Sequence, residues 1–245
     1  MNPNTVSNGI RVLVACEESQ RVCIAFRKQG FEAYSCDVLP CSGGHPEWHI
    51  HGDVLNILYP TKPDSFGAML PGPQKKIGFR TMDGSIHEIH GWDLMISHPP
   101  CTYLCNSGVR WLYEKEGRWE KLDDAADFFR WFLEADIEYI AVENPIPHKY
   151  TVEKIGRSYD QCIQPYQFEH PERKATCLWL RNLPELQPTK DVRAEMESLP
   201  KSQSQRIWYA SPGEDRAKER SKTFQGIADA MAEQWGRYIL SQRVR

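Results

Sequence analysis

Residues 11–36 read RVLVAC-EESQRVCIAFRKQG-FEAYSC, which is an apolar run, an amphipathic segment and a second apolar run. The run from Arg11 to Cys16 is short and β-branched, which is typical of a buried strand. The segment from Ser19 to Gln29 has its apolar residues at helical spacing, and Gly30 ends it. Phe31 to Cys36 is then a second strand. A strand, a helix and a strand in this order predict the beginning of a parallel sheet.

The same alternation continues along the chain. Apolar runs at Asp93–Ser97, at Tyr139–Val142 and in ATCLWL (residues 175–180) predict further strands, and Asp123–Ala135 predicts a strongly amphipathic helix. We therefore expect an α/β fold with a parallel, doubly wound sheet that is covered on both faces. The closing segment Ile227–Leu240 predicts a helix whose apolar residues lie on one face, at positions Ile227, Met231, Trp235 and Ile239.

Two segments interrupt this pattern. Residues 61–91 are rich in Pro, Gly and Lys, and their second half predicts a hairpin around Asp83-Gly84. Residues 183–221 are polar, contain four prolines and predict irregular structure. We expect a main domain at residues 1–182 with an insert at 61–91, a small region at 183–221, and a terminal helix at 222–245 that returns to the main domain.

Composition limits the classes of function. The net charge of −3 over 245 residues argues against nucleic-acid binding by bulk charge, although a local basic groove remains possible around Arg216, Lys218, Arg220 and Lys222. No apolar run approaches the length of a membrane span, and the N-terminus does not resemble an export signal. The eight cysteines are scattered, which favours reduced thiols and a cytoplasmic location.

Polar residues follow several of the expected strands. Asp37, Asp53, Cys101 and Glu143 each lie at or just after a strand end, where open α/β sheets bind ligands. Cys101 follows Pro99-Pro100, and Glu143 precedes Asn144-Pro145. A thiolate that adds to C6 of cytosine makes C5 nucleophilic, and a carboxylic acid near N3 stabilises the charge that develops. His98 and Arg173 are candidates for the positive field that such a thiolate needs.

These motifs, in this order, resemble the DNA cytosine-5 methyltransferase family, in particular its short phage and prophage members, from about Arg11 to Arg245. The resemblance implies a Rossmann-like S-adenosylmethionine (SAM) methyltransferase fold, a catalytic Cys101, and Glu143 at N3 of the target base. It implies that Arg173, with Lys174, helps to hold a flipped base. For the cofactor, it implies Asp53 at the adenine amino group and Asp37 at the ribose hydroxyls, and Phe224–Ala232 is similar to the terminal motif that completes the cofactor pocket. The resulting set of expected site residues consists of Cys101, Glu143 and Arg173 for catalysis; Cys16, Glu17, Asp37, Asp53 and Pro99 for the cofactor; and Pro100, Asn144, Lys174 and Arg220 for the substrate.

The chain departs from the family pattern in several places. The first loop, Cys16 to Gln20, has no glycine, Thr102 replaces the glutamine after the nucleophile, and the paired arginines of the basic motif are not reproduced around Arg173. The target-recognition region is reduced to about residues 183–221.

The function expected from the sequence is SAM-dependent methylation of cytosine C5 in DNA through a covalent adduct with Cys101. Two alternatives stay open: C5 modification of a free pyrimidine nucleotide, single-stranded DNA or RNA, and a non-catalytic binding protein with this fold. Cysteine and histidine can ligate zinc, but Cys36, Cys41, His45, His49 and His51 form no tidy pair of knuckles, and no metal is expected. Cys105 is expected to serve packing.

Overall fold

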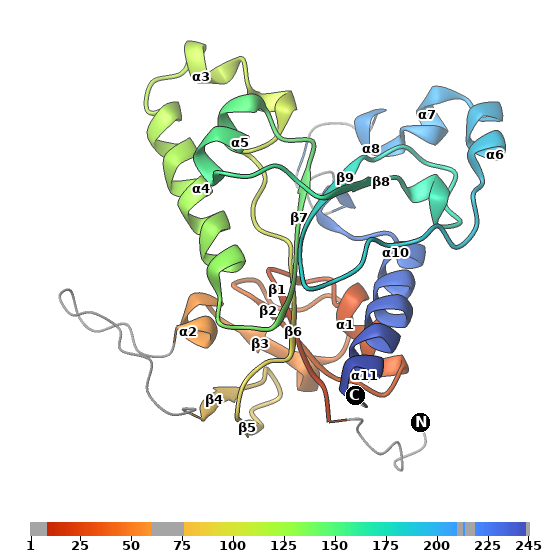
Figure 1. Ribbon diagram of the computed structural model, residues 1–245. Coiled ribbons are helices and arrows are strands. Elements are labelled where there is room, and N and C mark those ends of the chain that lie inside the picture. The colour runs from red at the N-terminus through yellow and green to blue at the C-terminus, as the bar shows by residue number, and fades with distance from the viewer. Residues whose placement is uncertain (1–8, 60–75, 210–212, 214–218, 244–245) are drawn as a thin grey trace.

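The computed structural model describes residues 9–59, 76–209, 213 and 219–243, and its centre is a seven-stranded sheet (Figure 1). The strand order is β3-β2-β1-β6-β7-β9-β8. The strands are β1 (Arg11–Ala15), β2 (Glu32–Asp37), β3 (His49–His51), β6 (Leu94–Ser97), β7 (Tyr139–Pro145), β8 (Gln161–Ile163) and β9 (Thr176–Arg181). The first five in this order pair in parallel. The α/β, doubly wound, Rossmann-like sheet expected from the sequence is confirmed.

The far edge of the sheet differs from the expectation. β9 pairs antiparallel with β7 on one side and with β8 on the other, so the expectation of a wholly parallel sheet is wrong there. β8 and β9 are close in sequence, with only a short 3₁₀ helix, η3 (Pro165–Gln167), between them. A connection this short suits an antiparallel pair better than a crossover helix between parallel strands.

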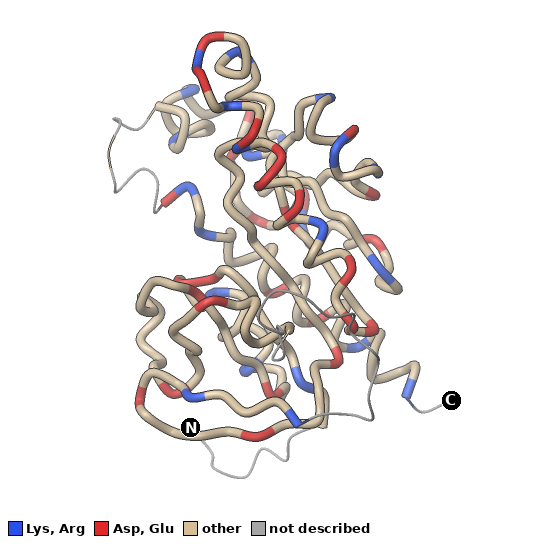
Figure 2. Tube along the Cα trace, turned by 90° about the vertical axis from the view of Figure 1, so that its left-hand side faces the viewer, with Lys and Arg blue, Asp and Glu red and all other residues tan. Residues whose placement is uncertain are grey.

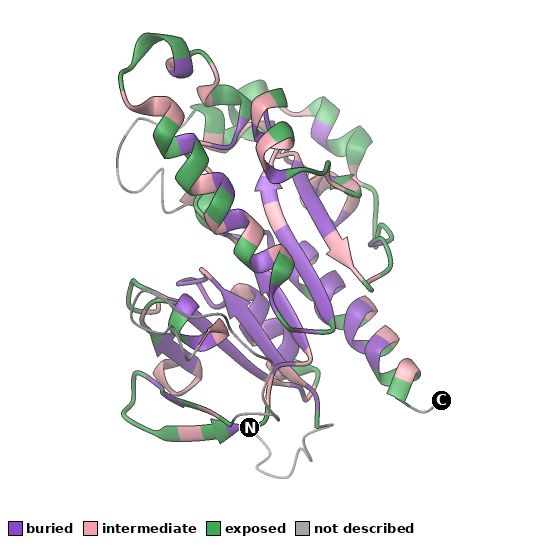
Figure 3. Cartoon of the chain, turned by 60° about the vertical axis from the view of Figure 1, so that its left-hand side comes forward, coloured by how far each residue is buried: buried purple, intermediate pink, exposed green. Residues whose placement is uncertain are grey.

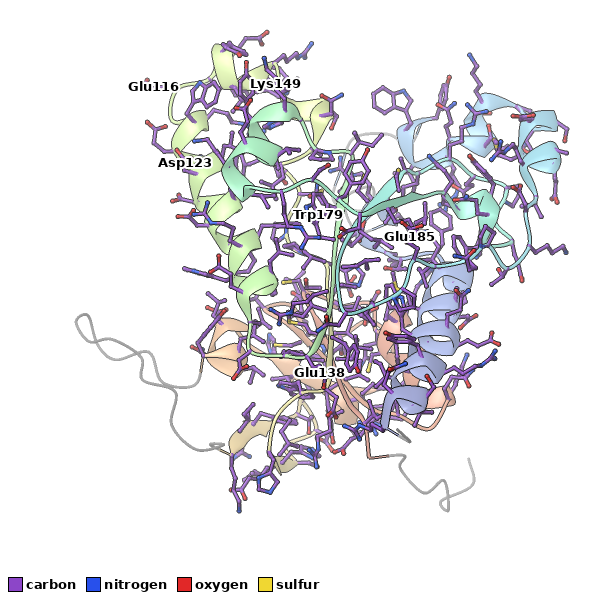
Figure 4. All side chains as sticks on the ribbon, viewed as in Figure 1. Glu116, Asp123, Glu138, Lys149, Trp179 and Glu185 are labelled. Carbon is purple, nitrogen blue, oxygen red and sulfur yellow. The ribbon has the colours of Figure 1, made fainter. Side chains whose placement is uncertain are left out.

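Helices cover both faces of the sheet (Figures 1 and 3). On one face, α1 (Arg21–Lys28) and the C-terminal helical segment pack on Val12, Val14 and Ile96. On the other face, α4 (Arg118–Glu134) packs on Leu13, Met95 and Val142. Shorter helices complete this second layer: α2 (Leu55–Leu58), α3 (Trp111–Glu114) and α5 (Lys149–Ile155). Trp179 lies in the second core, with its ring edge-on to Phe129 at 4.9 Å between centroids (Figure 4).

The C-terminal segment is helical, as expected, and Ile227, Met231, Trp235 and Ile239 are all buried. It consists of α10 (Gln225–Ala230), a π-helical turn η4 (Met231–Trp235) and α11 (Gly236–Arg243). In a regular α-helix, apolar residues at a strict spacing of four drift by about 40° per step. The wider π turn offsets part of this drift, because it holds more residues per turn, and keeps the stripe on the sheet.

The two segments that interrupt the strand–helix pattern can also be compared with the structure. The hairpin around Asp83-Gly84 is confirmed, with β4 (Ile77–Arg80) antiparallel to β5 (Ile86–Ile89). The region expected to be irregular instead carries three short helices in its described part, α6 (Arg193–Ser198), α7 (Lys201–Ser204) and α8 (Arg206–Tyr209). Arg216 and Lys218, considered above for a basic groove, lie outside the described residues. Two short 3₁₀ helices, η1 (Pro46–Trp48) and η2 (Asn106–Gly108), complete the described elements.

Charges of both signs are interspersed along the chain in the view of Figure 2. Among the described residues, no helix is both long enough and apolar enough to cross a membrane.

Gly226 provides a first test of the packing beneath the site. It lies at the start of α10, and a Cβ there would lie 2.1 Å from the backbone oxygen of Phe168. Glycine to alanine in a helix normally stabilises it, but here we expect Gly226→Ala to lower the free energy of unfolding by roughly 2–3 kcal/mol, because backbone must move. Denaturant titration measures this loss. Gly78→Ala, whose Cβ would meet nothing closer than 3.9 Å, is the matched control, and an equal loss in both variants would contradict the packing argument.

Candidate active site

The carboxyl end of β7 carries the acid that the sequence singled out. Glu138, just before β7, is labelled in the lower half of Figure 4, and Lys149, four residues after β7, is labelled near the top. The strand therefore runs upward in this view, between the two upper groups of helices (Figure 1). Side chains alternate along a strand. Glu143 therefore shares the face of Ala141, which packs with α1 and α10, whereas Asn144 lies on the opposite face.

Glu143 is paired with His98. The Nδ1 atom of His98 lies 2.8 Å from Oε2 of Glu143, and the two side chains are only 7% and 14% exposed. His98 directly follows β6, and its backbone N–H donates to the carbonyl of Ala15 on the neighbouring strand, which fixes the position of the ring. Neighbouring parallel strands that end together thus bring the two side chains into contact.

The pair is an ion pair. Burial alone would lower the pKa of His98, but the hydrogen bond to Glu143 and the charges of Glu143 and Glu17 raise it above its usual value. Burial alone would raise the pKa of Glu143, but His98 and Lys174 lower it. The proton therefore resides on the imidazole.

Lys174 connects this pair to Cys101. It lies just before β9, and its ammonium group interacts electrostatically with both Glu143 and Cys101. Nζ donates to the carbonyl of Lys222 at 3.1 Å, and burial lowers the pKa of the ammonium group. The expected nucleophile and the expected acid thus both interact with one partly buried cation.

Cys101 lies on a turn that is tied to the rest of the fold. The backbone N–H groups of Leu104 and Cys105 both donate to the Cys101 carbonyl at 3.1 Å. The guanidinium of Arg118, from the start of α4, donates to the Thr102 carbonyl at 3.0 Å. Pro99 is buried and Pro100 is exposed, so the turn emerges from the sheet just before Cys101, which is partly exposed.

Two groups contact the Cys101 sulfur. Nη2 of Arg220 donates to it at 3.5 Å, and its thiol is hydrogen-bonded to Cys105. The Cys105 contact and burial raise the pKa of Cys101, and Arg220 opposes them. The same contact lowers the pKa of Cys105, with help from the Ser107 hydroxyl at 3.2 Å. The easily lost proton of the pair is thus that of Cys105, whose pKa falls to about 5, and the Cys101 thiol then donates to the Cys105 sulfur.

A narrow cavity adjoins Glu143. Its volume of about 10 Å³ is close to the space that one water molecule needs, so a pyrimidine enters only if a wall moves. Lys174 and Phe224 both line this cavity, and the ammonium group of Lys174 lies 5.8 Å from the ring centre of Phe224. The full lining consists of His98, Glu143, Lys174, Thr176, Thr223, Phe224, Ile227 and Met231.

The ends of β1, β2 and β3 carry a second group of acids. Asp37 ends β2, and Oδ1 accepts from the N–H of Leu39 at 2.9 Å; burial raises the pKa of this carboxyl. Asp53 follows β3, and its Oδ1 accepts from the N–H of Leu55 at 2.9 Å. Glu18 is buried near Asp37, and its Oε1 has no hydrogen-bond partner among the described residues. A buried acid such as Glu18, with an oxygen that lacks a donor among the described residues, fits a ligand with hydroxyl or amino donors and a positive charge.

Glu17 and Cys16 occupy the glycine-poor first turn. The Glu17 carboxylate accepts from the N–H groups of Val22 and Cys23 at 2.7 and 3.2 Å, in the first turn of α1. Burial raises the pKa of Glu17, and the charge of His98 and these two N–H groups oppose that effect. The carboxyl group therefore occupies the helix N-terminus, where another fold would bind an anion. Cys16 adopts a positive φ of 58°, and burial raises the pKa of its thiol.

Two expected site residues lie apart from this cluster. The Arg173 guanidinium contacts the Met196 sulfur at 3.2 Å and Glu197 at 3.7 Å, and it is half exposed. The Asn144 side chain is buried, with its amide nitrogen donating to the Pro145 carbonyl. Lys174, the residue after Arg173, is the cation that faces Glu143.

Sequence reasoning missed Glu18 as a site residue, and it treated Cys105 as packing. Glu18 lies next to Glu17, and two adjacent acids in a strand–helix turn were a signal that one of them faces the ligand. Cys105 is four residues after Cys101, but no pattern in the sequence shows that the turn brings the two sulfurs together.

Metal binding finds no support in the described residues, which contain no group of three or more His, Cys, Asp or Glu side chains arranged to hold an ion. Both ring nitrogens of His49 form hydrogen bonds, Nδ1 with the Ser35 hydroxyl at 2.8 Å and Nε2 with the Leu39 carbonyl at 2.9 Å.

Comparisons with known proteins do not identify the reaction that this site catalyses. No protein-family model matches the sequence, and no curated protein matches it. Among solved structures, the chain is similar to a candidate DNA modification methyltransferase encoded within a prophage of E. coli, with 10% identity and a TM-score of 0.38. The match covers 70% of this chain and 46% of that one, so the chain spans less than half of that protein's length. A likeness this distant assigns neither a substrate nor residue roles.

Proposed function

We propose that this protein transfers a methyl group from SAM to C5 of cytosine in DNA, with Cys101 as the nucleophile. The observation that supports this proposal most directly is that one partly buried cation, Lys174, interacts with both Cys101 and Glu143 at the carboxyl edge of the sheet. A thiol that reaches C6 and a carboxyl group that reaches N3 of the same ring are what C5 chemistry on a pyrimidine requires.

In this proposal each residue has one task. Cys101, held beside Arg220, passes its proton to the sulfur of Cys105, with which it shares a hydrogen bond, and its own sulfur bonds to C6 of the ring, while N3 takes a proton from the acid at Glu143. The electron pair that reaches C5 is then available for an electrophile. Transfer of the C5 proton to water, return of the N3 proton to Glu143 and departure of the thiolate restore the aromatic ring. Lys174 and Phe224 line the space that a flipped base enters.

The cofactor would lie against β1, β2 and β3. When bound, SAM would supply an electrophilic methyl group. Asp37 and the unpartnered Glu18 offer acceptors for ribose hydroxyls and complement a positive sulfonium, and Asp53 follows the next strand. Glu17 contributes by fixing the start of α1. These groups fit SAM better than a dinucleotide, because the Glu17 carboxylate excludes a phosphate from that helix end.

Tritiated methyl transfer tests this function. Wild-type protein is incubated with [methyl-³H]SAM and, in parallel, with duplex DNA, single-stranded DNA, RNA and dCMP. We expect label in DNA, recovered as 5-methyldeoxycytidine on nucleoside mass spectrometry. If label appears only in RNA or only in dCMP, that molecule and not DNA is the substrate. If SAM binds but no label appears in any of the four, the protein is a non-catalytic binding protein.

Arg220 provides a separate prediction. Its guanidinium donates to the Cys101 sulfur and favours the thiolate, so Arg220→Ala should raise the pKa of Cys101. Because Arg220 is partly exposed, we expect a reduction of roughly 3- to 10-fold in the rate at which iodoacetamide alkylates Cys101 at pH 7.5. Peptide mass spectrometry follows Cys101 separately from Cys105.

Arg237→Ala is the matched control, because Arg237 lies on α11 and pairs with Glu233 on the surface. It should leave the alkylation rate unchanged. An Arg220→Ala protein that alkylates at the wild-type rate would show that Arg220 does not tune this thiol.

A further inference from the structure

The state of Glu143 creates a difficulty for the proposed chemistry. N3 of the ring needs a proton when the thiolate adds to C6, yet Glu143 is held as a carboxylate by His98 and Lys174. A carboxylate accepts hydrogen bonds and has no proton to give. The proton at N3 must therefore come through Glu143 from another group.

His98 is the group in position to supply it. Its Nδ1 lies 2.8 Å from Glu143 Oε2, within proton-transfer distance, and its side chain is 7% exposed. Nε2 is buried and has no hydrogen-bond partner among the described residues. The contact with Glu143 is thus the one hydrogen bond that the ring makes with the described residues, and no second acceptor among them competes for the proton.

We propose that His98 stores the proton that Glu143 delivers to N3, and acts as a positioning residue behind the catalytic carboxylate. This inference rests on the proposed function and deepens it. When the Cys101 sulfur bonds to C6, the proton on His98 Nδ1 moves to Glu143 Oε2, and Glu143 passes a proton on to N3. The imidazole is then neutral and Glu143 is again a carboxylate. When the thiolate leaves, the N3 proton returns along the same path, so the pair is restored.

The surrounding charges suit this role. Glu17, at the end of β1, faces His98 and helps to keep the imidazole protonated. Lys174, before β9, faces Glu143 from the other side and helps to keep it ionised. The pair therefore holds one proton in the resting state, and that proton is on His98.

Substitution by asparagine separates proton storage from simple positioning. In a His98→Asn variant, the new side-chain amide can occupy the place of Nδ1 and donate to Glu143, but it carries no transferable charge. If His98 only orients Glu143, His98→Asn retains activity. If His98 stores the proton, we expect single-turnover methyl transfer to fall about 10- to 100-fold, with the KM for DNA unchanged.

The pH profile adds a readout that orientation alone does not change. Wild-type activity should fall as the pH rises through the raised pKa of His98, because the pair loses its proton. In His98→Asn, Glu143 must itself be protonated, so this decline should move to lower pH. His90→Asn, an exposed histidine between β5 and β6, is the matched control and should keep the wild-type profile.

Release of tritium from [5-³H]cytosine in DNA follows the addition step itself. A wild-type protein that neither methylates DNA nor releases tritium overturns the proposed function, and this inference with it. An active wild type whose His98→Asn variant has the same rate and the same alkaline decline overturns only the role of His98.

The wild-type protein gives a measurement that does not depend on a variant folding. The ¹⁵N shifts of the His98 ring distinguish imidazolium from neutral imidazole. We expect imidazolium at pH 7, and a neutral ring at that pH would overturn the storage of a proton there.

Discussion

Cys101→Ser is expected to lower methyl transfer to DNA by at least about 10,000-fold, because the variant has no thiolate to add to C6. A serine hydroxyl has a far higher pKa than a thiol, and the groups around residue 101 are an arginine and a second cysteine, not a base suited to activate an alcohol. The acids at the ends of β2 and β3 do not depend on this side chain, so SAM binding measured by calorimetry should be unchanged.

A trapping experiment identifies the sulfur directly. DNA that contains 5-fluorocytosine should form a denaturation-resistant adduct with the wild type, because fluorine at C5 blocks the final elimination. Cys101→Ser should form none. Cys162→Ser, which changes an exposed cysteine, is the matched control and should trap DNA like the wild type. An adduct that maps to Cys105 would show that Cys105, and not Cys101, is the nucleophile.

The strands of the sheet and the place of the site could be predicted from the sequence, because both depend on local patterns. Buried strands such as β1 and β6 read as short apolar runs, and a polar residue ends β6 or follows β1 within two positions, at Ser97 and Glu17. Parallel strands end at one edge, so a strand-end rule is enough to place Cys101 and Glu143 near each other. The antiparallel edge could not be read in the same way, since the direction of β9 depends on the length of the connection from β8.

The sequence did not predict which side chains contact one another within the candidate site, because these contacts depend on the direction of each side chain. Arg173 and Lys174 are adjacent, and only the backbone path before β9 decides that Lys174 faces Glu143 while Arg173 contacts Met196. The lack of glycine in the first turn is plain from the sequence, but its physical consequence is not. Glu17 caps the helix itself, which leaves Glu18 as the acid without a partner among the described residues.

The second large effect is expected for Glu143→Gln. The glutamine keeps the shape of the side chain but cannot pass a proton to N3, so we expect methyl transfer to fall by about 100- to 10,000-fold. Adduct formation at Cys101 should slow to the same extent, because addition to C6 requires the proton at N3. Glu138→Gln, at the opposite end of β7, is the matched control and should keep wild-type activity (Figure 4).

Stability gives a readout of the ion pair that is independent of activity. The raised pKa of His98 contributes stability that is complete below the ordinary value of 6.5 and is lost as the pH rises through the folded value. The lowered pKa of Glu143 contributes stability that is complete above 4.5 and is lost as the pH falls through the folded value. The pair therefore stabilises the fold most between those two ordinary pKa values.

The difference in free energy of unfolding between wild type and Glu143→Gln should be largest in that window. We expect roughly 3 kcal/mol, near the lower end of the cost of breaking a buried ion pair, because the glutamine oxygen still accepts a hydrogen bond. Above the folded pKa of His98 the difference should shrink, since the imidazole is then neutral in both proteins. Urea titrations across the pH range measure it, and a difference that does not vary with pH would mean that His98 and Glu143 do not form an ion pair in the folded protein.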